Sequence, residues 1–179
     1  MSFDFPLLYA IQTTRTDFLD KLMLAVTRVA GNYGQIWIIL ALLLCVFKKS
    51  RRAGITMLIS YVLVYLVGNV ALKNLITRPR PFLLDETVTL LVEAPTSYSF
   101  PSTHAAWAFA AAASVFAWHK WAGTVCILAA FLIAFSRLYL FVHFPTDVFA
   151  GILLGIFMGV IAWLLVHSIS AKPAKKGKK

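Results

Sequence analysis

The run VFAGILLGIFMGVIAWLLV, residues 148–166, decides the fold of this chain because it contains no charged residue and no proline. An α-helix rises about 1.5 Å per residue, so a run of this length matches the hydrocarbon core of a bilayer, about 30 Å. A surface helix of a soluble domain would show a polar face at regular spacing, which this run lacks. The run therefore predicts a helix that crosses a membrane.

Composition supports the same conclusion for the whole chain. Of its 179 residues, 60% are hydrophobic and only 13% are charged, whereas soluble domains are nearer to half apolar and a quarter charged. Five apolar spans stand out, at about 33–47, 53–72, 103–118, 122–141 and 147–167. The sequence predicts an all-α fold, a polytopic integral membrane helical bundle with about five transmembrane helices. We expect one membrane-embedded domain over residues 1–170 and a disordered basic tail over residues 171–179.

The segment before the first span mixes apolar and charged residues at helical spacing. Leu19, Leu22, Met23 and Val26 share one face, while the charged residues lie off it. This pattern predicts one or two amphipathic N-terminal helices in the membrane interface. A helix packed against the bundle fits the pattern equally well.

When the spans are placed alternately across the bilayer, acidic and basic residues are distributed unequally between its two sides. One side receives ten basic residues and no acidic one: Lys48, Lys49, Arg51, Arg52, Lys120 and the five lysines of the tail. The other side receives all seven acidic residues. The positive-inside rule then places the tail in the cytoplasm and the loop 73–102 outside. The net charge of +10 forms no basic stripe interleaved with aromatic residues, so we expect no nucleic-acid partner.

Polar residues gather at the predicted outer ends of the spans, in three short segments. They are Lys73, Arg78 and Arg80 in KNLITRPRP, Ser102, Thr103 and His104 in PSTH, and Arg137, His143 and Asp147 in SRLYLFVHFPTD. Each of these residues, taken alone, could have a purely structural role: a lysine can extend from a helix end, and a serine can cap a helix. Charges at membrane depth are costly, however, and usually face a partner or a wet cavity. Their convergence at one level predicts a single site.

The residue types in this set suit a phosphoryl group. Lysine supplies a point charge, arginine a planar fork for two oxygens, and a helix N-terminus free N–H groups. Of two histidines, one can attack phosphorus while the other protonates the leaving oxygen. Asp147 can hold the second ring nitrogen of His143. Because Pro145 interrupts the run, we expect this contact in a turn that leads into a helix.

The carboxylates bear on metal use. A magnesium-assisted phosphatase needs two or more grouped carboxylates, and Asp147 is the only acidic residue of the cluster. Asp85, Glu86 and Glu93 lie in the connecting loop. We therefore predict a metal-independent site without a cofactor.

Together the three segments resemble the signature of the type 2 phosphatidic acid phosphatase superfamily, whose membrane members are helical lipid phosphatases. Their order and spacing match between positions 73 and 147, except that Thr103 stands where the family has glycine. The resemblance implies that His143 forms a phosphohistidine, that Asp147 orients it, and that His104 protonates the leaving group. The residues implied to bind the phosphoryl oxygens are Lys73, Arg80, Ser102, Thr103 and Arg137. Arg78 lies outside the signature and is expected to contact a second phosphate or the headgroup.

The resemblance also suggests a substrate, a membrane lipid phosphate or diphosphate. We favour undecaprenyl diphosphate, hydrolysed to undecaprenyl phosphate and inorganic phosphate at the outer face of a bacterial inner membrane. Phosphatidylglycerophosphate and phosphatidic acid are alternatives within the family. A transporter is a more distant alternative, since the sequence shows no internal repeats or broken helices. A serine protease built on Ser102 and His104 would leave Lys73, Arg80 and Arg137 unexplained.

Overall fold

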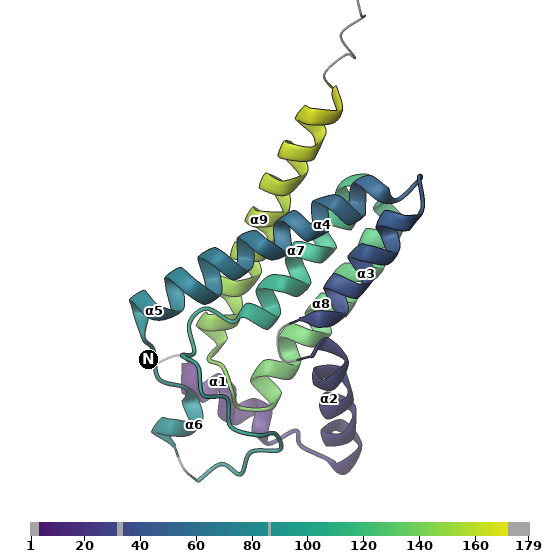
Figure 1. Cartoon of the computed structure of the whole chain (residues 1–179). Coiled ribbons are helices and arrows are strands. Elements are labelled where there is room, and N and C mark those ends of the chain that lie inside the picture. The colour runs from purple at the N-terminus through teal and green to yellow at the C-terminus, as the bar shows by residue number, and fades with distance from the viewer. Residues whose placement is uncertain (1–3, 32–33, 86, 172–179) are drawn as a thin grey trace, which may run out of the picture.

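The computed structural model describes residues 4–31, 34–85 and 87–171, and within these ranges the regular structure is entirely helical (Figure 1). The helices are α1 (Asp4–Gln12), α2 (Asp17–Ala30), α3 (Gln35–Val46), α4 (Arg51–Val64), the π-helical segment η1 (Tyr65–Leu72), α5 (Lys73–Ile76), α6 (Pro81–Leu84), α7 (Thr103–Trp118), α8 (Lys120–Tyr139) and α9 (Pro145–Ala171). The predicted all-α class is confirmed. The five predicted spans correspond to α3, α4 with η1, α7, α8 and α9.

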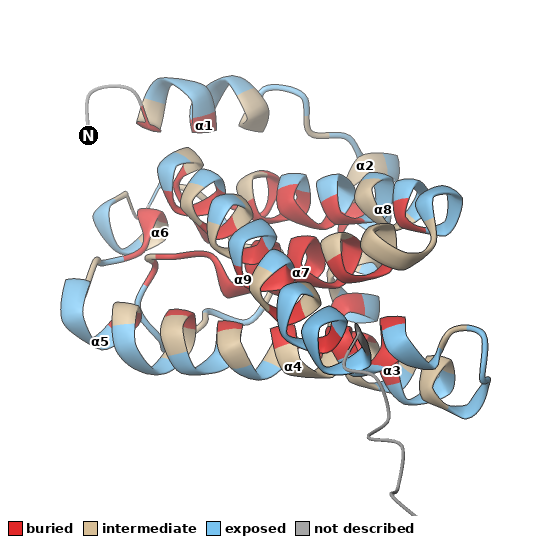
Figure 2. Ribbon diagram, turned by 90° about the horizontal axis from the view of Figure 1, so that it is seen from above, coloured by how far each residue is buried: buried red, intermediate tan, exposed pale blue. Residues whose placement is uncertain are grey.

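Helix α7 forms the centre of the bundle. Its alanine-rich sequence THAAWAFAAAASVFAW is buried along most of its length, and α4, α8 and α9 pack around it (Figure 2). On α9, a methyl group at Gly151 or Gly155 would overlap the backbone carbonyl oxygens of Ser102 and Ala106. Small residues on both helices therefore let the two backbones approach closely, as membrane helices commonly do.

The outward faces of the bundle are apolar. On α9, for example, Phe149 and Phe157 are more than half exposed, as expected of side chains that contact lipid. Among the residues that the structure describes, three helical stretches are long and apolar enough to cross a membrane: Arg51–Leu84, Lys120–Tyr139 and Pro145–Ser170. The bent pair of α2 and α3 provides a fourth span if its helices are taken together. Helix α7, with 16 residues, and helix α3, with 12, are each shorter than the length that this criterion requires.

The second predicted span is longer than expected because α4 continues through η1 into α5. A π-helix has wider turns than an α-helix and changes the direction in which the following side chains point. Helix α5 ends at Ile76, and the next residue, Thr77, has a left-handed φ of 46°. Residues 77–80 are non-helical, as the prolines predicted, and Pro81 then begins the short helix α6.

The two N-terminal helices pack against the bundle. On α2, Met23 is buried beside Tyr139 and Val142, and on α1, Leu8 is buried beside Phe144. The alternative of packed helices therefore describes both. Only α2 has the one-sided apolar pattern predicted for this segment, and its Leu22 remains 37% exposed. Of the predicted disordered tail, 171–179, the first residue, Ala171, ends α9, and residues 172–179 lie outside the described residues.

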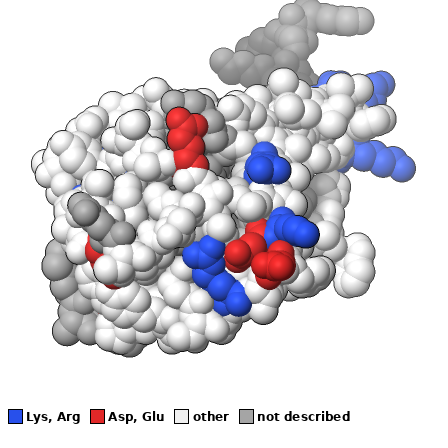
Figure 3. Space-filling view, turned by 90° about the horizontal axis from the view of Figure 1, so that it is seen from below, with Lys and Arg blue, Asp and Glu red and all other residues white. Residues whose placement is uncertain are grey.

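Charge separates the two ends of the bundle. Figure 3 looks onto the end with α1 and α6, where acidic and basic side chains lie close together on the surface. Arg15 and Asp20, for example, form an ion pair of 3.3 Å there. The opposite end, where α3 turns into α4 and α7 into α8, carries Lys48, Lys49, Arg51, Arg52 and Lys120. The basic residues of the described chain thus lie at the ends that the sequence predicted.

Candidate active site

A cavity of about 600 Å³ opens between η1, α5, α7, α8, α2 and the loop before α7. Six of the nine predicted site residues line it: Lys73, Arg80, Thr103, His104, Arg137 and His143. Ser102 and Asp147 are completely buried and are not part of this lining, and Arg78 is directed elsewhere. The structure thus brings the three sequence segments together around one cavity.

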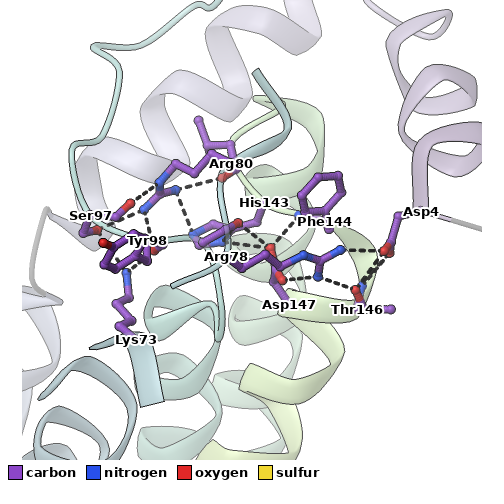
Figure 4. Close-up of polar contacts among 12 residues, drawn as sticks. Asp4, Lys73, Arg78, Arg80, Ser97, Tyr98, His143, Phe144, Thr146 and Asp147 are labelled. Carbon is purple, nitrogen blue, oxygen red and sulfur yellow. Dashed lines mark hydrogen bonds and ion pairs between the residues drawn. The ribbon is translucent and has the colours of Figure 1, made fainter. Parts of the chain in front are cut away.

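His143 lies in the connection between α8 and α9, and its two ring nitrogens have different neighbours (Figure 4). Nε2 is 3.3 Å from Nη1 of Arg80. A guanidinium group can only donate, so this contact requires a lone pair on Nε2 and places the proton of a neutral ring on Nδ1. Nδ1 is 3.4 Å from Oγ of Ser99 and 3.7 Å from Oδ2 of Asp147. A lone pair on Nε2 is what a nucleophilic histidine requires.

The surroundings of His143 favour this neutral form. Burial lowers the pKa of His143 well below its ordinary value of about 6.5, and the positive charges of Arg80, Arg137 and Lys73 lower it further. The imidazole is therefore unprotonated at neutral pH.

Arg80 and Lys73 hold the loop that covers the cavity. Arg80 donates from Nε to the carbonyl oxygen of Ser97 at 2.7 Å, and from Nη1 to that of Val142 at 2.8 Å. Its Nη2 donates to Oγ of Ser97 and the carbonyl oxygen of Tyr98, so with His143 all five donors of the guanidinium have an acceptor. Lys73 donates to the same two oxygens, at 3.0 and 2.9 Å. Oxygen atoms of the loop thus occupy the donors of both side chains at the edge of the cavity (Figure 4).

Arg137 is 5% exposed near the end of α8, beside the same cavity. Its Nη1 donates to Oγ1 of Thr27 on α2, while Nε has no hydrogen-bond partner within the described chain. A buried guanidinium with a free donor is costly unless a ligand completes it. This cation is thus suited to an incoming anion.

The start of α7 differs in detail from the sequence-based expectation. The backbone N–H of Ser102 donates to the carbonyl oxygen of Asp147 at 3.0 Å, so it is not free for a ligand. The Ser102 hydroxyl caps no helix and has no partner within the described chain. Nε2 of His104 donates to the carbonyl oxygen of Gly31 at 2.9 Å, which leaves Nδ1 for a reacting group. Gly31 holds a φ of 71°, which favours glycine at this turn.

Asp147 sits beneath His143, but it does not contact the ring directly at hydrogen-bond distance. Oδ2 accepts from Oγ of Ser99 at 2.5 Å and from the backbone N–H of Phe144 at 2.9 Å. Ser99 thus lies between the carboxylate and the imidazole. Helix α9 begins at Pro145, so His143 and Asp147 are related through the turn that leads into this helix, as the sequence predicted.

The placement of Arg78 does not support the predicted headgroup contact. Arg78 donates from Nη1 to Oδ1 of Asp147 at 2.5 Å and from Nη2 to Oδ2 of Asp4 at 2.8 Å. Its guanidinium lies 4.0 Å from the ring centroid of Phe144. This side chain therefore faces the back of Asp147 rather than the cavity.

Sequence reasoning missed several residues around the cavity. Asn69 on η1 lines it one turn before Lys73, and an amide within an apolar span was a visible signal. The contacts of the Ser97, Tyr98 and Gly31 carbonyls are made by backbone oxygens, which leave no trace in residue identity. Glu93 also lines the cavity, and Glu86 falls outside the described residues. Within the described chain, no three His, Cys, Asp or Glu side chains form a group that could hold a metal ion.

An apolar helical bundle around a cavity lined by arginine, lysine and two histidines is suited to a membrane-embedded enzyme that acts on a phosphoryl group. Comparison with family models identifies its family: the model of the PAP2 superfamily matches residues 53–170, and the chain belongs to this superfamily. The protein is a hydrolase of the phosphatase class, and it is a membrane protein.

Individual relatives agree with this assignment. A protein of Sulfolobus acidocaldarius named undecaprenyl-diphosphatase is 35% identical over 177 residues, which cover 98% of this chain and 83% of that protein. The crystal structure of Aquifex aeolicus LpxE superposes with a TM-score of 0.71 at 32% identity, covering 89% of this chain and 93% of that one. The transmembrane PAP2-type phosphatidylglycerolphosphate phosphatase from Bacillus subtilis also gives a TM-score of 0.71, at 26% identity, covering 94% of this chain and 85% of that one.

Proposed function

We propose that this phosphatase hydrolyses undecaprenyl diphosphate to undecaprenyl phosphate and inorganic phosphate through a phosphohistidine on His143. The observation that carries the mechanism is the set of cations, Lys73, Arg80 and Arg137, around one cavity with Nε2 of His143. The similarity over nearly the full length to a protein named undecaprenyl-diphosphatase supports the choice of substrate.

Two steps complete the reaction. Nε2 of His143 attacks the terminal phosphorus and the bond from phosphorus to the bridging oxygen breaks. His104 enters this step as an imidazolium, with Nε2–H held by the carbonyl oxygen of Gly31, and gives its Nδ1 proton to that oxygen. Undecaprenyl phosphate leaves, and the phosphoryl group remains on His143. Water then attacks phosphorus, His104 accepts its proton, and inorganic phosphate departs. Lys73, Arg80 and Arg137, with Ser102 and the backbone N–H of Thr103, stabilise the charge on the phosphoryl oxygens in both steps.

The orientation proposed here follows from charge. The cavity lies at the end of the bundle with mixed charge, and the opposite end is basic. The cavity then faces the periplasm or the exterior of a bacterial inner membrane, with the C-terminal tail in the cytoplasm. Residues 1–170 act as one membrane-embedded domain.

A second candidate substrate is phosphatidylglycerophosphate. The superposition on the phosphatidylglycerolphosphate phosphatase of Bacillus subtilis favours it, because the two chains agree over 94% of this one. Both substrates present a terminal phosphoryl group on a lipid, so the same residues would act on either. Phosphatidic acid serves as a third substrate for comparison.

The test is phosphate release by purified protein in detergent with EDTA, with kcat/KM compared for the three lipids. His143→Ala should abolish turnover, whereas the matched variant His167→Ala, at an exposed position near the other end of α9, should retain it. We expect undecaprenyl diphosphate to give the highest kcat/KM. Turnover that persists in His143→Ala, or that requires a divalent metal, would refute the mechanism. A higher kcat/KM for another lipid would refute the substrate.

A further inference from the structure

Both oxygens of the Asp147 carboxylate are engaged by residues that the family signature does not include. Arg78 donates to Oδ1 at 2.5 Å, and Ser99 donates to Oδ2 at 2.5 Å. Asp147 is fully buried, so these contacts fix it in an environment where water cannot substitute for them. The orientation of the carboxylate therefore depends on Arg78 and Ser99.

Ser99 also connects this carboxylate to the imidazole. Its single O–H is donated to Asp147, so its oxygen is free to accept from Nδ1–H of His143 at 3.4 Å. The direct distance from Nδ1 to the carboxylate is longer, 3.7 Å. The hydroxyl is thus placed to hold the ring with its proton on Nδ1, the form that presents a lone pair on Nε2.

Arg78 is in turn held by the N-terminal helix. Asp4, at the start of α1, accepts from Nη2 of Arg78 at 2.8 Å and is only 3% exposed. Its carboxylate also accepts from the backbone N–H and the hydroxyl of Thr146, at the start of α9. The carboxylate of Asp4 thus links Arg78 to Thr146 in the first turn of α9. Asp4 lies outside residues 53–170, the part that matches the family model.

We infer that Arg78 and Ser99 are positioning residues that set His143 for attack by fixing Asp147, and that Asp4 supports them by holding Arg78 (Figure 4). This inference rests on the proposed nucleophilic role of His143. A buried carboxylate that loses its cation must take up a proton, move, or recruit water. Each outcome weakens its hold on the ring without altering the cations that bind phosphate.

The test compares Arg78→Ala and Ser99→Ala with the unchanged protein in the same detergent assay. Residues that orient a catalytic group from behind typically contribute about 10- to 100-fold, so we expect kcat to fall by about that factor. KM and the inhibition constant of inorganic phosphate should stay within about twofold, because Lys73, Arg80 and Arg137 are intact. Arg78→Lys should restore part of the loss, since it keeps the positive charge beside Asp147.

Asp4 gives a second, independent measurement. Asp4→Asn should lower kcat less than Arg78→Ala does, because Asp147 keeps its own partner. In a protein that carries both Asp4→Asn and Arg78→Ala, kcat should fall no further than in Arg78→Ala alone, because Asp4 acts through Arg78. Matched controls are Arg52→Ala, an arginine at the far end of the bundle beside Trp118, and Ser168→Ala, an exposed serine near the end of α9.

Each alternative has its own signature. A rise in KM with unchanged kcat in Arg78→Ala would make Arg78 a headgroup contact and overturn the inference. Unchanged kcat in both single variants, or a loss matched by weaker phosphate inhibition and a lower melting temperature, would also overturn it. The proposed function fails separately, through activity that survives in His143→Ala.

Discussion

The close contact between α7 and α9 leads to a prediction that links the fold to the site. In Gly151→Ala, the new methyl group would overlap the carbonyl oxygen of Ser102. Because carbon atoms need about 3.5 Å to their neighbours, the two helices would have to separate by about 1 Å. The backbone bond from Ser102 to Asp147, now 3.0 Å, lies at this contact and would stretch.

The size of the effect follows from two opposing contributions. Forcing one extra methyl group into a packed interface costs about 1–3 kcal/mol, whereas alanine gains about 1 kcal/mol over glycine within a helix. The net loss is up to about 2 kcal/mol, which lowers the melting temperature of a chain of this size by up to about 8 °C. Displacing catalytic groups by about 1 Å can cost about 100-fold in rate. We therefore expect a large fall in kcat/KM with a modest fall in stability.

The assay combines thermal unfolding in detergent at a fixed scan rate with phosphate release. Gly68→Ala is the matched control, since its methyl group would meet the flexible end of Leu154 rather than backbone. It should not lower the melting temperature. A Gly151→Ala protein with unchanged activity would show that the spacing of α7 and α9 does not position the site.

Two further predictions concern the histidines. Because burial and neighbouring cations lower the pKa of His143, the acidic limb of the kcat/KM profile should lie below pH 6.5; a limb at or above pH 7 would contradict a neutral His143. His104→Ala should reduce hydrolysis of the lipid diphosphate by about 100- to 10,000-fold, the usual contribution of a general acid. An aryl phosphate whose leaving group is an acidic phenol needs no proton from the enzyme, so the activity of His104→Ala on this substrate should fall much less. Equal losses on the lipid diphosphate and the aryl phosphate would argue against His104 as the acid.

The sequence predicted the helices well where apolar length and a polar boundary coincide. The expected span 103–118 has the bounds of α7, because PSTH precedes an uninterrupted apolar run. The extension of the second span through η1 was missed, since a π-turn has no distinctive composition.

The site was predictable to the level of which residues converge, but not of how they pair. Arg78 resembles the other cations of its segment, and only the fold shows that Asp4, far away in sequence, takes up its charge. Ser99 lies outside the signature, and its residue type alone indicates no role at the site. Its contacts with His143 and Asp147 depend on the course of the backbone on either side of Pro101. Local sequence does not determine that course.

The loop oxygens on Lys73 and Arg80 have a consequence for turnover. Since the donors of Lys73 and Arg80 already have partners, a phosphoryl group bound as proposed would exchange one set of oxygen ligands for another at these two side chains. The measured affinity is then the difference between two sets of contacts, which keeps it moderate despite the strong field of the cations. The exchange also runs in reverse, so Ser97 and Tyr98 compete with inorganic phosphate for the same donors. In the proposed reaction one product is a small, highly charged anion, and this competition would help to release it.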